Sequence, residues 1–341
     1  KGGPEAELWL GAHPGSPSRT ENGTLLDVVP GRLPFLLKVL AAGSPLSLQA
    51  HPTMDQAQLG FERENAAGIP LDDPKRNYKD AFHKPELIYA LSERFEALCG
   101  FRSAAEIRAT LERLLERQGP SGPIEDWMSR LRSDDDLRPV FEWLITRGEG
   151  VDALLTALVA HADHATTALD TVADLAEAYP GDPGIAISLM LNRVTLQRGE
   201  VLYLPAGNIH AYLSGVGIEL MASSDNVLRG GLTPKHVDVP ELLDVLDFRP
   251  LPVPYLEPER PQPGVRVFRP DVPDFALVVA EGSADVPLTG PAIALCVEGG
   301  FAIAGEAGAT TLDRGEAVFV SADEAELAIE GGGLLFVATT G

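Results

Sequence analysis

Short alternating runs of apolar and polar residues dominate both ends of the chain. Near the N-terminus, apolar runs such as LPFLLKVL are separated by turn-forming clusters such as GAHPGSPSRTENG. From Pro250 onward, proline-rich turns alternate with short apolar runs as far as the C-terminus. Alternation with a period of two, interrupted by glycine and proline, predicts β-strands. Both ends of the chain are therefore expected to form β-sheets.

A helical period replaces this alternation in residues 102–179. Apolar residues recur there three and four positions apart, beginning with Ile107 and Leu111. Ser103, three residues before Glu106, has the spacing of a capping box at a helix N-terminus. We expect this block to be an α-helical domain inserted between β segments, with a role that the sequence leaves open.

Several predicted strands carry polar side chains among apolar ones. Because side chains alternate across a strand, Gln49 and His51 point the same way, about 7 Å apart. Lys38 shares a face with apolar neighbours, and Lys84 shares one with Glu86. Such groups are costly to bury unless they are paired or bind a ligand. From the residues alone, Gln49 and His51 could chelate a metal, or His51 could be a hydrogen-bonded histidine of the strand. Lys38 could lie at a strand edge, and Lys84 and Glu86 could form a surface ion pair.

The most informative stretch runs from Gly199 to Lys235. An apolar run ends at the turn Pro-Ala-Gly, and His210 follows three residues later. A second alternating run comes next, and a short loop then gathers Asp225, Arg229 and Lys235. We interpret this stretch as a hairpin that brings one metal-type ligand, one carboxylate and two cations to the same end of a sheet.

The chain contains one short internal sequence repeat. Residues 198–206 read RGEVLYLPA, and residues 314–322 read RGEAVFVSA. The second copy continues without a histidine. Two β-barrels of one type, the later one without its metal ligand, would explain the match.

The composition of the chain limits the classes of molecule that it can be expected to bind. A length of 341 residues favours two or three domains, and a formal net charge of -23 argues against nucleic acid or an anionic membrane surface. An anionic substrate would therefore need a local cluster of Lys and Arg. The two cysteines, Cys99 and Cys296, lie far apart and indicate buried thiols in a reducing compartment, so we expect a cytoplasmic protein. No run is long enough for a membrane span, and no signal peptide is visible.

The spacing of Gly199, Pro205, Gly207 and His210 resembles the second sequence motif of the cupin superfamily. It departs from the usual form at Ser214, where many cupins carry Asn. The resemblance implies jelly-roll β-barrels. The expected fold is thus mainly β with a helical insertion: two cupin-type jelly-roll barrels plus an α-helical domain.

A second resemblance covers residues 5–101 and 180–245. The blocks ELWLGAHP, LPFLLKVL, LSLQAHP, NYKDAFHKPEL, FEALCGFR, LPAGNIHAYL and GIELMASSDNVLRGGLTPK occur in the order found in type I phosphomannose isomerases. Together they imply a discontinuous catalytic cupin domain at 1–101 and 180–245, followed by a cupin-like domain without a metal site at 246–341. The chain lacks the aromatic strand that usually precedes ELWLGAHP, so we expect an N-terminal piece to be missing.

The resemblance implies interconversion of mannose 6-phosphate and fructose 6-phosphate with one zinc ion per chain. The zinc ligands that it implies are Gln49, His51, Glu86 and His210. By themselves, these residues indicate a divalent metal with nitrogen and oxygen ligands. The identification of the metal as zinc comes from the resemblance.

The reaction moves a proton between C1 and C2 through an enediol, with a clamp for the phosphate. The catalytic candidates are Arg229, which looks like the family's catalytic arginine, and Glu219, Asp225 and Lys84. Both Glu219 and Asp225 are candidates for the general base. The residues expected to bind substrate or phosphate are Lys38, Ser47, Tyr212 and Lys235.

Two other functions are considered. A cupin oxygenase would use a site of two histidines and one carboxylate for iron, whereas the implied ligands include an amide beside a cation cluster. A non-catalytic sugar-phosphate-binding cupin is the main alternative. We expect a monomer that binds a small sugar phosphate, and neither nucleic acid nor membrane. His13 in GAHP is interpreted as a turn residue.

Overall fold

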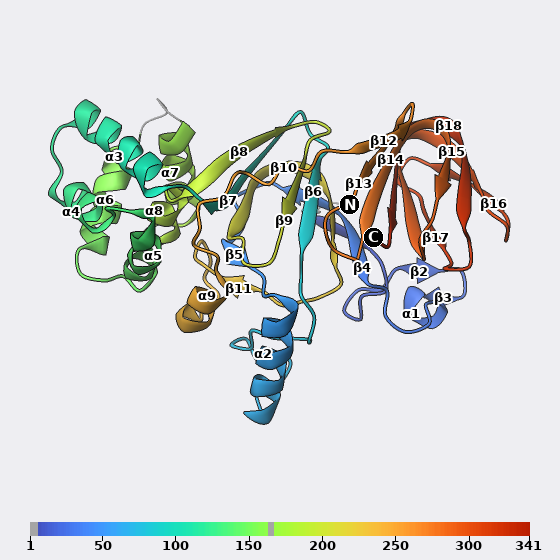
Figure 1. Ribbon diagram of the computed structural model, residues 1–341, viewed down its shortest axis with the longest axis horizontal. Coiled ribbons are helices and arrows are strands. Elements are labelled where there is room, and N and C mark those ends of the chain that lie inside the picture. Colours follow the sequence, from blue (N-terminus) through green and yellow to red (C-terminus); the bar gives the residue numbers. More distant parts are fainter. Residues whose placement is uncertain (1–5, 163–166) are drawn as a thin grey trace.

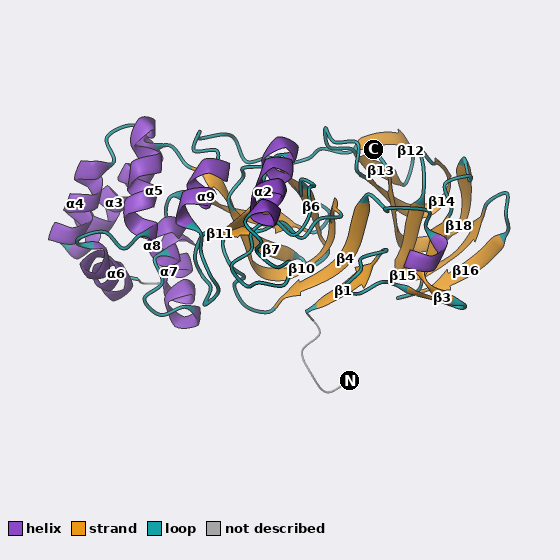
Figure 2. Ribbon diagram, turned by 90° about the horizontal axis from the view of Figure 1, so that it is seen from below, coloured by secondary structure: helices purple, strands orange, loops and turns teal. Residues whose placement is uncertain are grey.

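The computed structural model describes residues 6–162 and 167–341. It shows an elongated molecule, with a group of helices at one end, a β-sheet in the middle and a second β-sheet at the other end (Figure 1). The same order is visible after a quarter turn (Figure 2). This arrangement is the fold class predicted from the sequence, mainly β with a helical insertion.

The middle sheet has nine strands in the described part of the chain. They are β1 (Glu7–Leu10), β4 (Phe35–Ala42), β5 (Gln49–Ala50), β6 (Glu86–Ala90), β7 (Arg94–Phe101), β8 (Leu191–Gln197), β9 (Val201–Leu204), β10 (His210–Ala222) and β11 (Leu228–Arg229). The second half of β8 shows the alternation expected of a strand with one buried face, whereas all five residues of β6 are buried.

β10 holds the middle sheet together, because it pairs with four other strands. Its first half pairs with β5 and β7, and its second half, from Gly215, pairs with β4 and β6. Close pairing on both sides requires a residue without a side chain at Gly217, where a Cβ atom would lie 2.9 Å from the carbonyl oxygen of Tyr89. β10 therefore connects the two halves of the sheet.

The helical group arises from the periodic apolar residues of the insertion. It comprises α3 (Ala104–Gln118), α4 (Gly122–Arg130), η1 (Asp134–Asp136), α5 (Leu137–Ile145), α6 (Val151–Ala160), α7 (Thr167–Ala178) and α8 (Gly184–Ser188). The predicted cap is present, since the Ser103 hydroxyl accepts a hydrogen bond from the Glu106 N–H. The apolar faces of these helices share one core with residues of the middle sheet such as Leu98 and Leu213.

Four short elements and one longer helix lie beside the sheets. They are β2 (Arg19–Thr20), β3 (Gly23–Thr24), α1 (Leu25–Val28), α2 (Met54–Ala66) and α9 (Val239–Val245). None of the helices in the described ranges is long and apolar enough to cross a membrane.

The second sheet has seven strands in the described residues. They are β12 (Glu259–Gln262), β13 (Val265–Phe268), β14 (Ala276–Pro287), β15 (Ala292–Ala304), β16 (Ala309–Asp313), β17 (Ala317–Val320) and β18 (Glu326–Thr339). It packs on the middle sheet through an aromatic cluster. There, Tyr89 makes edge-to-face contacts with Phe268 and Phe336 at centroid distances of 5.9 and 5.0 Å.

The same kind of turn occurs in both sheets, as the internal sequence repeat suggests. Gly199 before β9 and Gly315 before β17 have φ angles of +92° and +88°. The N–H of Gly199 donates to the Ala90 carbonyl at 2.9 Å, and the N–H of Gly315 donates to the Cys296 carbonyl at 2.8 Å. The two matching runs therefore begin at the same kind of turn.

The second sheet has no histidine after its copy of this turn. Glu324 lies there instead and is buried. Its carboxylate accepts hydrogen bonds from the N–H groups of Glu306 and Ala307 at 2.7 and 2.6 Å. The carboxylate at this position is therefore held by backbone donors.

Candidate metal centre and active-site pocket

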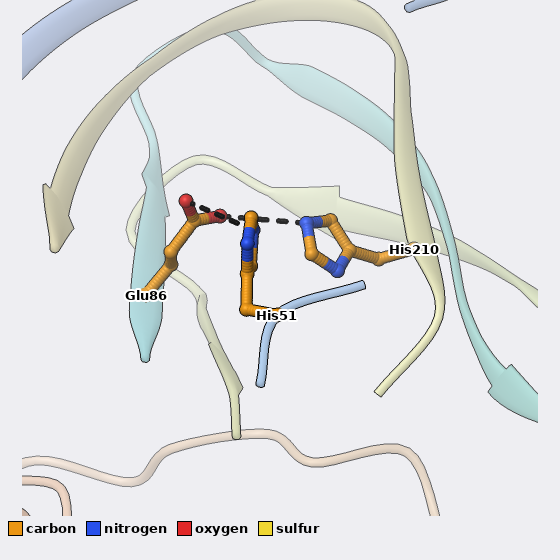
Figure 3. A group of neighbouring side chains, drawn as sticks. All are labelled: His51, Glu86 and His210. Carbon is orange, nitrogen blue, oxygen red and sulfur yellow. Dashed lines mark ion pairs between the residues drawn. The ribbon is translucent and has the colours of Figure 1, made fainter. Parts of the chain in front are cut away.

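Three side chains with metal-binding atoms meet inside the middle sheet (Figure 3). His51 follows β5, Glu86 begins β6 and His210 begins β10. Their ligand atoms lie within 4.8 Å of one another, and each residue is only 1% exposed. The pairing of β10 with β5 and β6 brings together residues that are distant in the sequence.

Both histidines are oriented by backbone carbonyl groups. The Nδ1 of His51 lies 2.7 Å from the Asn226 carbonyl, and the Nδ1 of His210 lies 3.1 Å from the Asn208 carbonyl. When Nδ1 donates in this way, Nε2 carries the lone pair, which is the arrangement of metal-binding histidines. Each Nε2 faces Glu86, at 3.3 and 3.4 Å.

Two atoms of this group lack hydrogen-bond partners among the described residues. They are the Nε2 of His51 and one carboxylate oxygen of Glu86, both fully buried. Buried polar atoms without partners are rare, and a metal ion would satisfy both at once. Burial lowers the pKa of His51 to about 4, with a further contribution from Lys84. A neutral imidazole beside a carboxylate is the state that a divalent cation requires.

Gln49 lies next to this group. It stands opposite His210 in the pairing of β5 with β10, and its amide Nε2 is 3.3 Å from the Nε2 of His210. The two ends of an amide differ only in the assignment of oxygen and nitrogen, so a half rotation would present Oε1 at the same place. Gln49 therefore has the position of a fourth ligand.

A cavity of about 630 Å³ opens beside the metal group. Gln49 and Glu86 line it, and so do all eight residues assigned to catalysis or substrate binding. These are Lys38, Ser47, Lys84, Tyr212, Glu219, Asp225, Arg229 and Lys235. The cavity thus gathers cations, carboxylates and hydroxyl groups above one candidate metal site.

Two buried ion pairs hold charge inside the cavity. Lys38 Nζ lies 2.9 Å from Glu219, and Lys84 Nζ lies 2.8 Å from Glu86, with all four side chains less than 10% exposed. The interpretations of Lys38 as a lysine at a strand edge and of Lys84–Glu86 as a surface pair are therefore wrong. Burial raises the pKa of Glu86, but Lys84 and His51 outweigh it and hold the pKa well below its usual range.

The chain resembles known isomerases over nearly its full length. The family model "Phosphomannose isomerase type I, catalytic domain" matches residues 27–104. The mannose-6-phosphate isomerase of Escherichia coli (strain K12) is 37% identical over 97% of this chain and 90% of that protein. The mannose-6-phosphate isomerase of Rattus norvegicus is 33% identical over 95% of this chain and 85% of that protein.

The chain belongs to the type I phosphomannose isomerase family. Solved structures agree: a zinc-bound mannose 6-phosphate isomerase superposes with a TM-score of 0.89 at 36% identity, over 99% of this chain and 91% of that one. A mutant phosphomannose isomerase from Salmonella typhimurium superposes with a TM-score of 0.90 over the same shares. Membership makes this chain a metal-dependent isomerase. The alternative of a non-catalytic sugar-phosphate-binding cupin is not favoured.

Zinc is the cofactor of this family member. The His51, Glu86 and His210 group fits the ion because two of its buried ligand atoms lack other partners. Histidine nitrogens and carboxylate oxygens are usual zinc ligands, and the amide of Gln49 is an uncommon one.

The sequence did not reveal the partner of Asp225. His13, interpreted as a turn residue, places its Nε2 3.0 Å from both carboxylate oxygens of Asp225. This hydrogen bond is the largest cause that lowers the pKa of Asp225. The two residues are 212 positions apart, and neither carries a local signal for the contact.

Tyr179 is a second residue that sequence reasoning missed at the site. It is the last residue of the predicted helical block 102–179. It lines the cavity and donates a hydrogen bond from its hydroxyl to the Pro45 carbonyl at 2.8 Å. The end of the helical insertion therefore forms part of the cavity wall.

Arg229 differs from the other cations of the cavity. It is half-buried on β11, and it has no ion-pair or hydrogen-bond partner for its guanidinium among the described residues. Burial lowers its pKa. A half-buried guanidinium without a partner is available to an anionic or oxygen-rich ligand. Lys235, by contrast, is exposed at the rim.

Proposed function

We propose that the cavity beside Glu86 interconverts mannose 6-phosphate and fructose 6-phosphate by moving a proton between C1 and C2. One observation carries the proposal: buried histidine and carboxylate atoms without partners lie beside a cavity lined by Lys38, Lys84, Arg229 and Lys235. A metal site suits an enediol, which develops negative charge on two neighbouring oxygens, and a cation cluster suits a phosphate dianion.

Zinc would be held by Gln49, His51, Glu86 and His210. It would supply Lewis-acid stabilisation of the sugar oxygens that become negative during the reaction. Lys84, 2.8 Å from Glu86, adds positive charge on the same side and keeps this carboxylate ionised.

Glu219 is our preferred general base. It is 3% exposed, its partner Lys38 on β4 also lines the cavity, and it shares strand β10 with Tyr212, another residue of the cavity lining. Asp225 has a half-exposed side chain and is engaged by His13. A base at the buried side of the cavity can exchange a proton with the substrate in an environment from which water is excluded.

The phosphate group is assigned to the open side of the cavity. Lys235 is exposed there, and Ser47 offers a hydroxyl on the same wall. Arg229 lies between this rim and the metal group, on the strand that pairs with Gln49. We therefore assign to Arg229 the stabilisation of charge on the reacting sugar oxygens, and to Tyr212 a hydrogen bond to the sugar.

A kinetic comparison tests the role of Arg229. Arg229→Ala should retain bound metal and lose turnover of mannose 6-phosphate by about two orders of magnitude, the usual effect of removing a preorganised donor. Lys235→Ala should instead raise KM with a smaller change in kcat, since it contacts only the phosphate. A near-normal kcat in Arg229→Ala would remove this residue from the chemistry.

The finer organisation is also proposed. We assign residues 1–101 and 180–245 to the catalytic domain, 102–179 to the helical domain and 246–341 to the C-terminal domain. The net charge of -23 supports a protein that binds no nucleic acid. The free, buried thiols of Cys99 and Cys296 support a cytoplasmic location. We propose that the protein is a monomer, which light scattering at assay concentrations would test.

A further inference from the structure

A second cavity lies where the helical insertion meets the middle sheet. Its volume is about 510 Å³, and α3, the start of α7 and strands β7 and β8 line it. Figure 1 shows these helices beside the end of the sheet, away from the second sheet. The charged residues among the described lining are four arginines: Arg102, Arg113, Arg117 and Arg193. No acidic residue is among the described residues that line it.

Two of these arginines converge on one hydroxyl group. The Nη2 of Arg102 donates to Thr110 Oγ1 at 2.8 Å, and the Nη2 of Arg113 donates to the same oxygen at 3.3 Å. In the described part of the chain, neither guanidinium has a carboxylate within ion-pair distance. Two cations therefore share a neutral acceptor, and the charge of each disfavours the charge of the other.

The pKa of Arg102 is affected by its burial and by its neighbours. Burial is the largest cause that lowers its pKa; Glu106 opposes the shift, and the neighbouring charge of Arg113 adds to it. Arg102 also donates to the carbonyl groups of Leu189 and Glu106. These bonds fix its guanidinium at the cavity wall and give it a structural role as well.

Arg193 adds positive charge on the strand side. Its guanidinium pairs with Glu96 at 2.9 Å, but the same carboxylate also pairs with Arg94 at 2.7 Å. One carboxylate thus serves two arginines. The Nη1 of Arg193 donates to the hydroxyl of Thr171, another residue of the cavity lining.

We propose that this cavity is a binding site for a phosphorylated small molecule, with the phosphate between Arg102 and Arg113 and the carbon skeleton on the apolar floor. Guanidinium groups present donors in a fork that matches phosphate oxygens. Leu98, Leu114 and Leu189 provide a floor that is almost inaccessible to water. The volume lies within the range of small-molecule sites. In a chain with a net charge of -23, two neighbouring arginines that share a neutral hydroxyl group, Arg102 and Arg113, are best explained by an anionic ligand.

The site is separate from the isomerase cavity. Leu98 lies on its floor, whereas the next residue, Cys99, pairs with His210 in the sheet. Side chains alternate across a strand, so neighbouring residues of β7 face opposite sides. The two cavities also share none of the described residues that line them, so the proposal does not rest on the assigned catalytic roles.

Isothermal titration of the zinc-loaded protein tests the proposal. The probes are inorganic phosphate, AMP and ribose 5-phosphate, each added to the unmodified protein, Arg113→Gln, Arg130→Gln and Lys235→Gln. Arg113 is exposed, so its replacement should leave folding intact, and a thermal unfolding curve checks this. Arg130 is a matched helical arginine outside the cavity, where it pairs with Asp126. Lys235 belongs to the isomerase cavity.

We expect a saturable binding event, separate from phosphate binding in the isomerase cavity, that weakens at least about tenfold in Arg113→Gln, the usual effect of losing a charge-assisted hydrogen bond. The same event should be unchanged in Arg130→Gln and Lys235→Gln. Tighter binding of AMP would identify a nucleotide as the ligand class, and tighter binding of ribose 5-phosphate a sugar phosphate. Equal affinity in all four proteins, weakening only in Lys235→Gln, or no saturable binding would overturn the proposal.

Discussion

Individual residues of the site follow one physical rule, which is that a buried polar group needs a partner. Lys38 has Glu219, and Lys84 has Glu86. By contrast, the Nε2 of His51 and one carboxylate oxygen of Glu86 have no hydrogen-bond partner among the described residues. Buried polar atoms without hydrogen-bond partners indicate the metal site more directly than the spacing of residues in the sequence does.

Replacing one ligand should remove the metal. His210→Ala deletes an Nε2 that lies 3.4 Å from Glu86, so bound zinc and isomerase activity should fall together. Metal analysis of the purified variant, paired with an activity assay, measures both. His161→Ala, which changes a histidine of the helical insertion, is the matched control and should keep full zinc. Full zinc occupancy in His210→Ala would show that the ligand assignment is wrong.

The identity of the base can be decided by isotope exchange. Glu219→Gln keeps the shape of the side chain but cannot take a proton, so exchange of hydrogen at C2 of the substrate should be lost. Asp225→Asn should slow turnover less, because Asp225 is half-exposed and already engaged by His13. Proton NMR of the substrate in deuterated buffer follows the exchange. The reverse order of effects would assign the proton transfer to Asp225.

The contact between His13 and Asp225 predicts a pH effect. Its hydrogen bond holds the pKa of Asp225 below the usual value of 3.8. Because the folded-state pKa is depressed, the stabilisation is present above pH 3.8 and is lost as the pH falls through the folded-state pKa. His13→Ala should raise the pKa of Asp225 towards 3.8, with Lys84 and Lys38 still lowering it somewhat. Carbon NMR of the labelled carboxyl group would detect this, and an unchanged pKa would show that His13 does not hold Asp225.

At the scale of elements, β10 determines where the ligands lie. The sequence predicted its strand, the turn before it and the inward position of His210, because period and turn residues are local signals. It could not predict that β10 pairs with four strands, since pairing depends on partners far away in the chain. The His13–Asp225 contact was missed for the same reason.

The turn before β10 offers a test of this dependence. Gly207 has a φ of +79°, and a Cβ atom there would lie 3.1 Å from the Val245 carbonyl oxygen. Its N–H also donates to the His51 carbonyl at 2.9 Å. Gly207→Ala should therefore lower the free energy of unfolding by about 1–3 kcal/mol and weaken zinc binding, because two ligands depend on this turn.

Gly315→Ala is the control for this substitution. Gly315 has a similar φ of +88°, but no atom lies within 4 Å of its added Cβ. It should show only the backbone strain, with zinc affinity unchanged. Denaturant unfolding and a competitive zinc titration measure both variants. Equal losses of zinc affinity in the two variants would contradict the role given to the turn of Gly207.

At the scale of the molecule, a strongly acidic chain concentrates positive charge in two cavities. One lies beside the metal group and the other under the helical insertion. The sequence predicted the class of fold, the order of its β and α segments and the need for a local cation cluster. It did not predict that Tyr179 of the insertion would reach the isomerase cavity, or that four arginines would meet at the junction, because both arise from packing between distant segments.

The most direct test of the account is the rate of fructose 6-phosphate formation as a function of bound zinc. The protein is stripped with a chelator, and zinc is returned in steps below one equivalent while a coupled assay follows turnover of mannose 6-phosphate. We predict negligible activity without metal and a linear rise that reaches its plateau at one zinc per chain. Full turnover in the metal-free protein, or none in the fully loaded one, would contradict the assignment of this buried group as the catalytic metal centre.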